Sequence, residues 1–206
     1  MLYLVTNRHI ANKDFFNIIE ESIKGGIDKI ILREKDLCTT KLLELSIEVK
    51  KITDKYNIPL IINSNLKVAQ EINAYGFHCG YEDFISNKYK YDGVIGVSIH
   101  SIDEAIICEK KGANYVLAGH IFETNCKKGL PPKGLNFINE LKKTISIPII
   151  GIGGINETNI NMILNTKISG VAVMSHIMAS MNPYIDTKIL KNHIQLIFGG
   201  DNHEQF

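Results

Sequence analysis

The chain has 206 residues, which is enough for one large domain or two small ones. Hydrophobic residues make up 45% of it and charged residues 22%, ordinary values for a globular protein that buries a sizeable core. The formal net charge of +1 argues against broad electrostatic binding of nucleic acid or of an anionic membrane surface, so functional positive charge must be local.

The amino-terminal segment and the cysteines bear on the cellular compartment. The first residues, "MLYLVTNRHIANKDFF", have no basic start, no long apolar core and no small-residue cleavage site, so we expect no signal peptide. No run reaches the roughly 20 apolar residues that span a membrane. Widely spaced cysteines without a CxxC pair argue against a structural zinc site or a disulfide framework: Cys38, Cys79, Cys108 and Cys126. We therefore expect a reduced, cytoplasmic location.

Short apolar runs alternate with helix-favouring segments along the whole chain. The first half contains runs at 2–6, 29–34, 59–63 and 76–80. The segment after the first run, "KDFFNIIEESIKGG", has apolar residues at helical spacing and ends in a Gly-Gly stop. The second half repeats this rhythm with runs at 93–100, 114–120, 147–154 and 169–175. The pattern predicts eight strands with about as many helices.

The apolar runs are continuous rather than alternating, which indicates a parallel sheet covered on both faces. An open doubly wound sheet has the same pattern, but eight units in about 200 residues favour a closed barrel. No linker rich in Pro, Gly or Ser divides the chain. We predict an α/β protein with a single (β/α)8 TIM barrel over residues 1–198, followed by a flexible tail at 199–206.

Active sites of such barrels form where the strands end at their carboxyl side, which selects candidate residues. Arg33 and Lys35 follow the second run, where Arg33 can bind an anion bidentately and Lys35 offers a point charge. The alternative is that both form salt bridges around Glu34 at the barrel rim. Asn63 ends the third run and either binds a polar ligand group or caps the next helix. Ser98 ends the fifth.

The last two strand ends predict a phosphate site. "GIGG" at 151–154 places Gly153 and Gly154 after the seventh run, where they allow backbone N–H groups to approach a ligand closely. Met174 and Ser175 follow the eighth run, and Ser175 begins a short helix. The loops at these two positions of a barrel often bind phosphate. The alternative is that the glycines only permit a tight turn.

His120 is the histidine best placed for chemistry, because it ends the sixth run beside a loop that contains Thr124, Lys127 and Gly129. It could be a ligand, a proton carrier or a polar residue that closes the strand. His78 lies within the fourth run and is expected to be a hydrogen-bonded core residue. The others, His100 and His176 among them, show no carboxylates at metal-ligand spacing, so we expect no metal site.

Nine segments together resemble the thiamine phosphate synthase/TenI superfamily. They are "LYLVTN", "LREKD", "LIIN", "GFHCGYEDF", "GVSIHSIDEA", "YVLAGHIFET", "CKKG", "IPIIGIGGI" and "GVAVMS". They occur in the family's order and cover residue 2 to about 180. The resemblance implies one of two activities: synthesis of thiamine phosphate from a thiazole phosphate and a pyrimidine diphosphate with magnesium, or tautomerisation of a thiazole in the TenI branch.

Three departures from the synthase pattern favour the tautomerase. Ile31 stands where synthases have a Gln, and Ser64 stands where they have a magnesium-binding Asp, which leaves Asp83 as the one remaining acid. "GHIFET", with His120 and Glu123, replaces the synthase motif "GPIFPT" and is similar to TenI proteins. The resemblance therefore implies a thiazole tautomerase, an isomerase that aromatises the carboxythiazole ethyl phosphate made by thiazole synthase, without metal or organic cofactor.

This interpretation assigns a role to each candidate residue. His120 would carry the proton, because an imidazole both accepts and donates near neutral pH. The substrate would be bound by Arg33, Lys35, Asn63, Ser98, Thr124 and Lys127, and its phosphate by Gly153, Gly154, Met174 and Ser175. The resemblance also implies a homodimer with a small thiazole phosphate as its ligand. The alternatives are a magnesium-dependent thiamine phosphate synthase and a non-catalytic TenI-like regulatory or binding protein.

Overall fold

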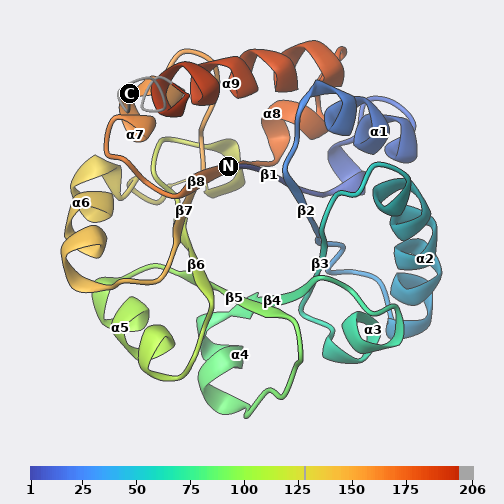
Figure 1. The fold of residues 1–206 in the computed structure, drawn as a ribbon, viewed down its shortest axis with the longest axis horizontal. Coiled ribbons are helices and arrows are strands. Elements are labelled where there is room, and N and C mark those ends of the chain that lie inside the picture. The colour runs from blue at the N-terminus through green and yellow to red at the C-terminus, as the bar shows by residue number, and fades with distance from the viewer. Residues whose placement is uncertain (128, 200–206) are drawn as a thin grey trace, which may run out of the picture.

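Eight parallel strands pair in sequence order, and the ring closes because β1 (Leu2–Val5) also pairs with β8 (Gly170–Val173) (Figure 1). The structure, a computed structural model, describes residues 1–127 and 129–199. The strands between are β2 (Lys29–Leu32), β3 (Leu60–Asn63), β4 (Gly76–Gly80), β5 (Val94–Ile99), β6 (Tyr115–Gly119) and β7 (Ile149–Ile152). The closed ring confirms the predicted (β/α)8 barrel and excludes the open doubly wound sheet.

Helices surround the ring and cover the outer face of the strands (Figure 1). They are α1 (Phe15–Gly25), α2 (Thr39–Lys55), α3 (Leu66–Glu71), α4 (Tyr81–Ser86), α5 (Ile102–Lys110), α6 (Gly134–Thr144), α7 (Ile160–Leu164), α8 (Ser175–Met178) and α9 (Pro183–Phe198). Two short 3₁₀ turns, η1 (Arg8–Ile10) and η2 (Asn125–Lys127), lie in the loops after β1 and β6. The predicted Gly-Gly stop is confirmed, since α1 ends at Gly25 and Gly26 adopts the left-handed conformation.

The core has two layers, as a barrel requires. Apolar side chains on the outer face of the strands pack against the helices, and a smaller set fills the interior of the ring. The interior set contains Tyr3, Val5, Ile31, Ile61, Tyr115, Leu117, Ile150 and Ala172. Because both faces of every strand are buried, the strands read as continuous hydrophobic runs.

The predicted runs overlap all eight strands but extend past several of them. The run at 147–154 is the clearest case, because β7 ends at Ile152. Gly153 and Gly154 follow with φ values of +102° and +68°, which no extended strand can continue. Apolar content alone therefore marks the strand but not its end.

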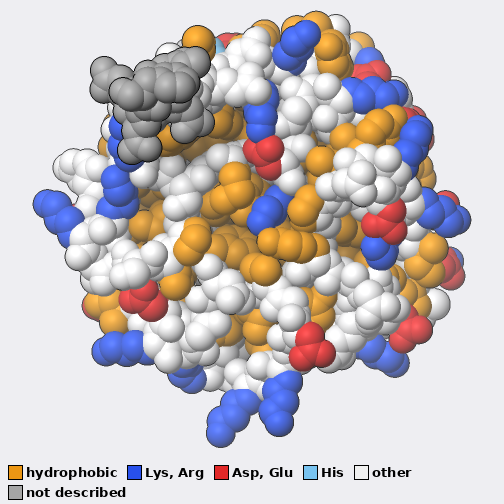
Figure 2. Space-filling model, viewed as in Figure 1, with side chains coloured by type: hydrophobic (Ala, Val, Ile, Leu, Met, Phe, Trp, Pro, Cys, Tyr) orange, Lys and Arg blue, Asp and Glu red, His pale blue; other side chains and the backbone are white. Residues whose placement is uncertain are grey.

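Figure 2 shows charged side chains around the periphery of one face of the barrel and mainly hydrophobic side chains near its centre, with a Lys or Arg side chain among them. No helix within the described residues is long and apolar enough to cross a membrane. Of the tail predicted at 199–206, only Gly199, which caps α9, is described, and residues 200–206 lie outside the described residues. The homodimer stays a prediction.

Candidate active site

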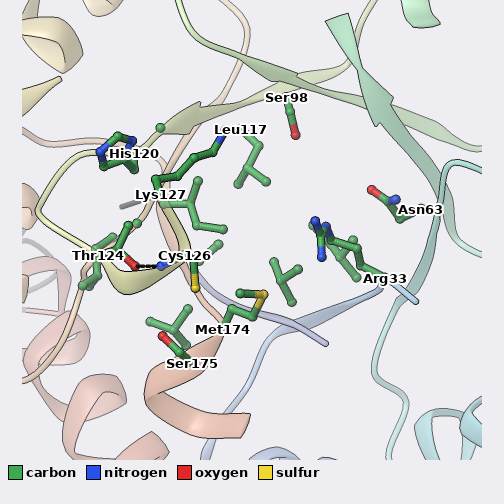
Figure 3. A pocket seen from close by; sticks show the side chains of 18 of the residues that line it. Arg33, Asn63, Ser98, Leu117, His120, Thr124, Cys126, Lys127, Met174 and Ser175 are labelled. Carbon is green, nitrogen blue, oxygen red and sulfur yellow. Dashed lines mark hydrogen bonds between the residues drawn. The ribbon is translucent and has the colours of Figure 1, made fainter. Parts of the chain in front are cut away.

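A cavity of about 340 Å³ opens at the carboxyl ends of the strands. Apolar side chains from inside the ring form part of its wall, among them Ile31, Leu117 and Ile152. Polar side chains from the loops surround them, and Figure 3 shows Arg33 and Lys127 on opposite sides of this space. The volume is in the range of cavities that bind small molecules.

The structure places every sequence-predicted site residue on the wall of this one cavity. They are Arg33, Lys35, Asn63, Ser98, His120, Thr124, Lys127, Gly153, Gly154, Met174 and Ser175. They come from β2, β3 and β5 to β8 and the loops after these strands, so the rule that strand ends meet at one edge brings together residues 142 positions apart, from 33 to 175. Their individual roles stay predictions.

Three cationic side chains converge on the cavity: Arg33, Lys35 and Lys127. The charge of Arg33 is the largest cause that lowers the pKa of Lys35, followed by burial and by the charge of Lys127. Within the described part of the chain, no Asp or Glu lines this cavity. Like charges held together without a counter-ion favour an anionic ligand, which would relieve their repulsion.

From the sequence, Arg33 and Lys35 either bind a ligand or form salt bridges around Glu34, and the structure shows that Glu34 pairs with another arginine. Glu34 is buried and binds Arg8, whose Nη1 lies 3.0 Å from Oε2. Thr6 donates its hydroxyl to the same carboxylate at 2.7 Å. Glu34 therefore neutralises Arg8 from the loop after β1, which leaves Arg33 and Lys35 available to a ligand.

Asn63 does not cap the helix that follows it. Asn65 does so, because its side-chain oxygen accepts from the backbone N–H of Val68 at 3.0 Å. Asn63 instead donates its amide to the hydroxyl of Ser64 at 2.7 Å. Ser64 also lines the cavity, so these two neighbours present a joined polar surface to a ligand.

The glycines after β7 are needed for packing as well as for any ligand. A Cβ at Gly153 would lie 2.3 Å from Cβ of His120, and one at Gly154 would lie 2.2 Å from the carbonyl oxygen of Glu123. Backbone hydrogen bonds join the same two loops, since the N–H of Ile121 donates to Ile152 and that of Phe122 donates to Gly153. The glycines therefore form a tight turn that is also part of the cavity wall.

His120 lies in the cavity wall, with 8% of its surface exposed. Its Nε2 is 3.2 Å from the carbonyl oxygen of Leu130, so the ring contacts the far side of the loop between β6 and α6. The backbone carbonyl of His120 also accepts from Lys133. These contacts tie the strand end to the loop that carries Lys127.

Among residues 1–127 and 129–199, no carboxylate lines the cavity where it could bind a magnesium ion. Asp83, the acid expected from the resemblance, is not among the residues that line it and accepts a hydrogen bond at 2.9 Å from Asn87, the residue that follows its helix. No cluster of three or more His, Cys, Asp or Glu suited to a metal occurs in the described residues. Mg²⁺ bound with substrate phosphates usually takes one or two carboxylates, so the side chains present do not fit such an ion.

Several cavity residues were not among the sequence-predicted site residues. Cys126 and Ser64 line the cavity, as does His78, which is 1% exposed and confirms the expected buried, hydrogen-bonded residue. The signal for His78 was its alternation within β4, which points the side chain into the ring. His100 donates a hydrogen bond from Nδ1 to the carbonyl oxygen of Gly119 at 2.7 Å and also lines the cavity.

Burial makes His78 an acid-sensitive residue. Burial, and then the charge of Arg33, lowers the pKa of His78 from 6.5 to about 3. Below about pH 6.5 the unfolded chain therefore binds a proton at this ring that the folded chain does not bind. The free energy of unfolding should fall by about 1–2 kcal/mol between pH 6.5 and 5. Urea unfolding across this range measures it, and His78→Gln should remove that slope; equal stability of the parent at both pH values contradicts the prediction.

Comparison with known proteins places the chain in a family. The family model described as thiamine monophosphate synthase matches residues 2–177. The chain is 41% identical over 184 residues to a thiamine-phosphate synthase of Clostridium acetobutylicum, covering 87% of each chain. It is 38% identical over 193 residues to one of Methanobrevibacter smithii, covering 92% of each. A thiamine phosphate pyrophosphorylase structure from Pyrococcus furiosus superposes with a TM-score of 0.87 at 29% identity, with 96% of both chains covered.

These relatives correct the functional interpretation drawn from the sequence. Reading the chain as a thiazole tautomerase, and so as an isomerase, is wrong, because the similar curated proteins are named as synthases. The departures at Ile31, Ser64 and His120 are few against a match that spans nearly the whole chain. The chain belongs to the thiamine monophosphate synthase family.

Proposed function

We propose that this protein is a thiamine-phosphate synthase, a transferase that joins a thiazole phosphate to a hydroxymethylpyrimidine diphosphate. The observation that carries the proposal is the 41% identity to curated thiamine-phosphate synthases over nearly the full length of both chains. The cavity supports it, because Arg33, Lys35 and Lys127 surround a space without carboxylates among the described residues. Both substrates carry phosphate groups, which such a site attracts.

The two ends of the cavity suit the two substrates. Arg33 and Lys35 lie at the end of β2, where they would hold the diphosphate, and Arg33 can do so bidentately. Gly153 follows β7 and Ser175 begins α8, where they would hold the phosphate of the thiazole. The diphosphate is the group that leaves, so cations placed around it stabilise the charge that develops there.

The direct test mixes the purified protein with the two half-substrates and measures thiamine phosphate by chromatography. We expect product at a rate that depends on enzyme concentration, with the Clostridium acetobutylicum relative as the positive control. One arm contains magnesium chloride and a second contains a chelator. No product in either arm, while the positive control turns over, contradicts the proposal.

The cysteines give a test of ligand binding that needs no turnover. Burial raises the pKa of the Cys79 and Cys108 thiols to about 12, so neither should react with iodoacetamide in the folded protein. Cys38 and Cys126 are exposed and should react, and Cys126 lines the cavity (Figure 3). A bound substrate should slow alkylation of Cys126 severalfold and leave Cys38, the matched control, unchanged in peptide mass mapping. Equal slowing at both positions contradicts the assignment of the cavity.

A further inference from the structure

Three polar side chains on neighbouring strands form a chain of hydrogen bonds that ends in the cavity. The ring nitrogen Nδ1 of His78 lies 2.9 Å from the hydroxyl of Tyr115, and Nε2 lies 2.8 Å from the hydroxyl of Ser98. Tyr115 is 4% exposed and belongs to the interior layer of the barrel. Ser98 lies at the cavity end of this chain, and Figure 3 shows its hydroxyl pointing into the open space.

A glycine makes this contact possible. Gly96 on β5 pairs with His78 on β4 and with Tyr115 on β6, so the three lie at one level of the ring. A Cβ at Gly96 would lie 2.0 Å from Cζ of Tyr115, which means that the tyrosine ring occupies the space of the missing side chain. Ser98 follows two residues later on the same face of β5, within reach of the same imidazole.

His78, the imidazole between Tyr115 and Ser98, is neutral and so carries a single ring N–H. His78 is almost fully buried, and that burial, with the charge of Arg33, lowers its pKa to about 3. A neutral imidazole carries one N–H and one lone pair, so it donates to one neighbour and accepts from the other. The direction of the whole chain therefore depends on which neighbour donates to it.

The buried hydroxyl of Tyr115 determines which group donates in each hydrogen bond of this chain. Among the described residues its hydroxyl has no hydrogen-bond partner other than His78. If Nδ1 donated to this hydroxyl, the buried O–H of Tyr115 would have no acceptor, at a cost of about 1–3 kcal/mol. If Tyr115 donates to Nδ1, both groups are satisfied. Nε2 must then carry the proton and donate it to the oxygen of Ser98.

We propose that this chain orients the hydroxyl of Ser98 so that its proton is available, in the cavity, to a ligand atom that accepts a hydrogen bond. Ser98 contacts the ligand, and His78 and Tyr115 are positioning residues that act through it. Because the oxygen of Ser98 already accepts from His78, its own proton is free for the ligand.

The choice of ligand for the kinetic test rests on the proposed function. The test uses the pyrimidine diphosphate, because a pyrimidine ring nitrogen is a hydrogen-bond acceptor of the required kind.

Nitrogen-15 NMR of the histidine rings tests the direction without any ligand or activity. We expect His78 to be neutral and protonated at Nε2, with its signal identified by its loss in His78→Gln. Tyr115→Phe removes the donor to Nδ1 and should shift the tautomer toward Nδ1–H. Tyr91→Phe is the control, because Tyr91 donates its hydroxyl to the carbonyl of Ala74 and lines no part of this cavity. Finding Nδ1 protonated in the parent protein overturns the proposal.

Kinetics test the consequence for the ligand. Ser98→Ala should raise KM for the pyrimidine diphosphate by about tenfold, since it removes one hydrogen bond. Tyr115→Phe should raise it by about two- to tenfold, because the hydroxyl of Ser98 then spends part of its time in the wrong orientation. In both variants kcat should change less than KM. An unchanged KM in both variants overturns the donor role, whereas absence of turnover in the parent contradicts the proposed function and leaves the NMR result to decide the direction.

Discussion

Replacing Arg33 by alanine should lower kcat/KM for transfer from the pyrimidine diphosphate by about 10²–10³-fold, the usual effect of removing one donor that is preorganised toward a developing anion. Arg33 points into the cavity, and its guanidinium has no acidic partner among the described residues. Its charge also lowers the pKa of Lys35 more than any other cause does. A diphosphate in this space would accept from both side chains.

Two matched variants separate charge from geometry at this position. Arg33→Lys keeps the positive charge but loses the planar pair of donors, so it should recover only part of the activity. Lys51→Ala removes a positive charge from α2, where Lys51 pairs with Glu48 outside the cavity, and should leave the rate unchanged. A steady-state assay with both half-substrates measures all three. Activity of Arg33→Ala within about twofold of the parent contradicts the role of Arg33.

The fold was predictable because each strand is covered on both faces and therefore reads as an uninterrupted apolar run. Strand ends were less predictable, as at Gly153, where a backbone conformation rather than hydrophobicity stops β7. The rule that strand ends converge then placed eleven separated residues on one wall without any knowledge of contacts. Sequence position and topology were sufficient for that step.

Pairings between distant residues could not be read from the sequence. Glu34 stands between two cations in "LREK", yet it binds Arg8, which lies 26 residues earlier. The hydroxyl of Ser98 depends on His78, 20 residues before it, and through that ring on Tyr115. Such contacts follow from which strands are neighbours and which side chain is missing between them, as at Gly96.

The choice of the tautomerase over the synthase is the part of the sequence-based prediction that fails. It rested on single positions such as Ile31 and Ser64, and the structure gives both of them local roles. Ile31 is 1% exposed and packs within the ring. Ser64 accepts from Asn63 and its N–H donates to the carbonyl of His78. Similarity along the whole chain carries more weight than these positions.

Replacing Glu34 by alanine should lower the free energy of unfolding by about 3 kcal/mol, because buried groups then lose their partner. Glu34 is 4% exposed, and its carboxylate accepts from three donors: the hydroxyl of Thr6, the backbone N–H of Arg8 and its guanidinium. Glu34→Gln keeps an oxygen for Thr6 but loses the charge, so it should cost less. Urea unfolding at neutral pH gives these values.

Asp36 is the matched control, since it binds the same arginine from an exposed position. The guanidinium of Arg8 holds the pKa of Asp36 well below its usual range, yet this carboxylate is solvated. Water and salt screen such a pair, so Asp36→Ala should change stability far less than Glu34→Ala does. Thr6 adds a link to the active site, because its hydroxyl also accepts from the backbone N–H of Arg33 at 3.0 Å. Glu34→Ala should therefore also reduce activity at temperatures where the protein is still folded. Equal losses of stability in Glu34→Ala and Asp36→Ala contradict the expectation that burial decides the strength of these contacts.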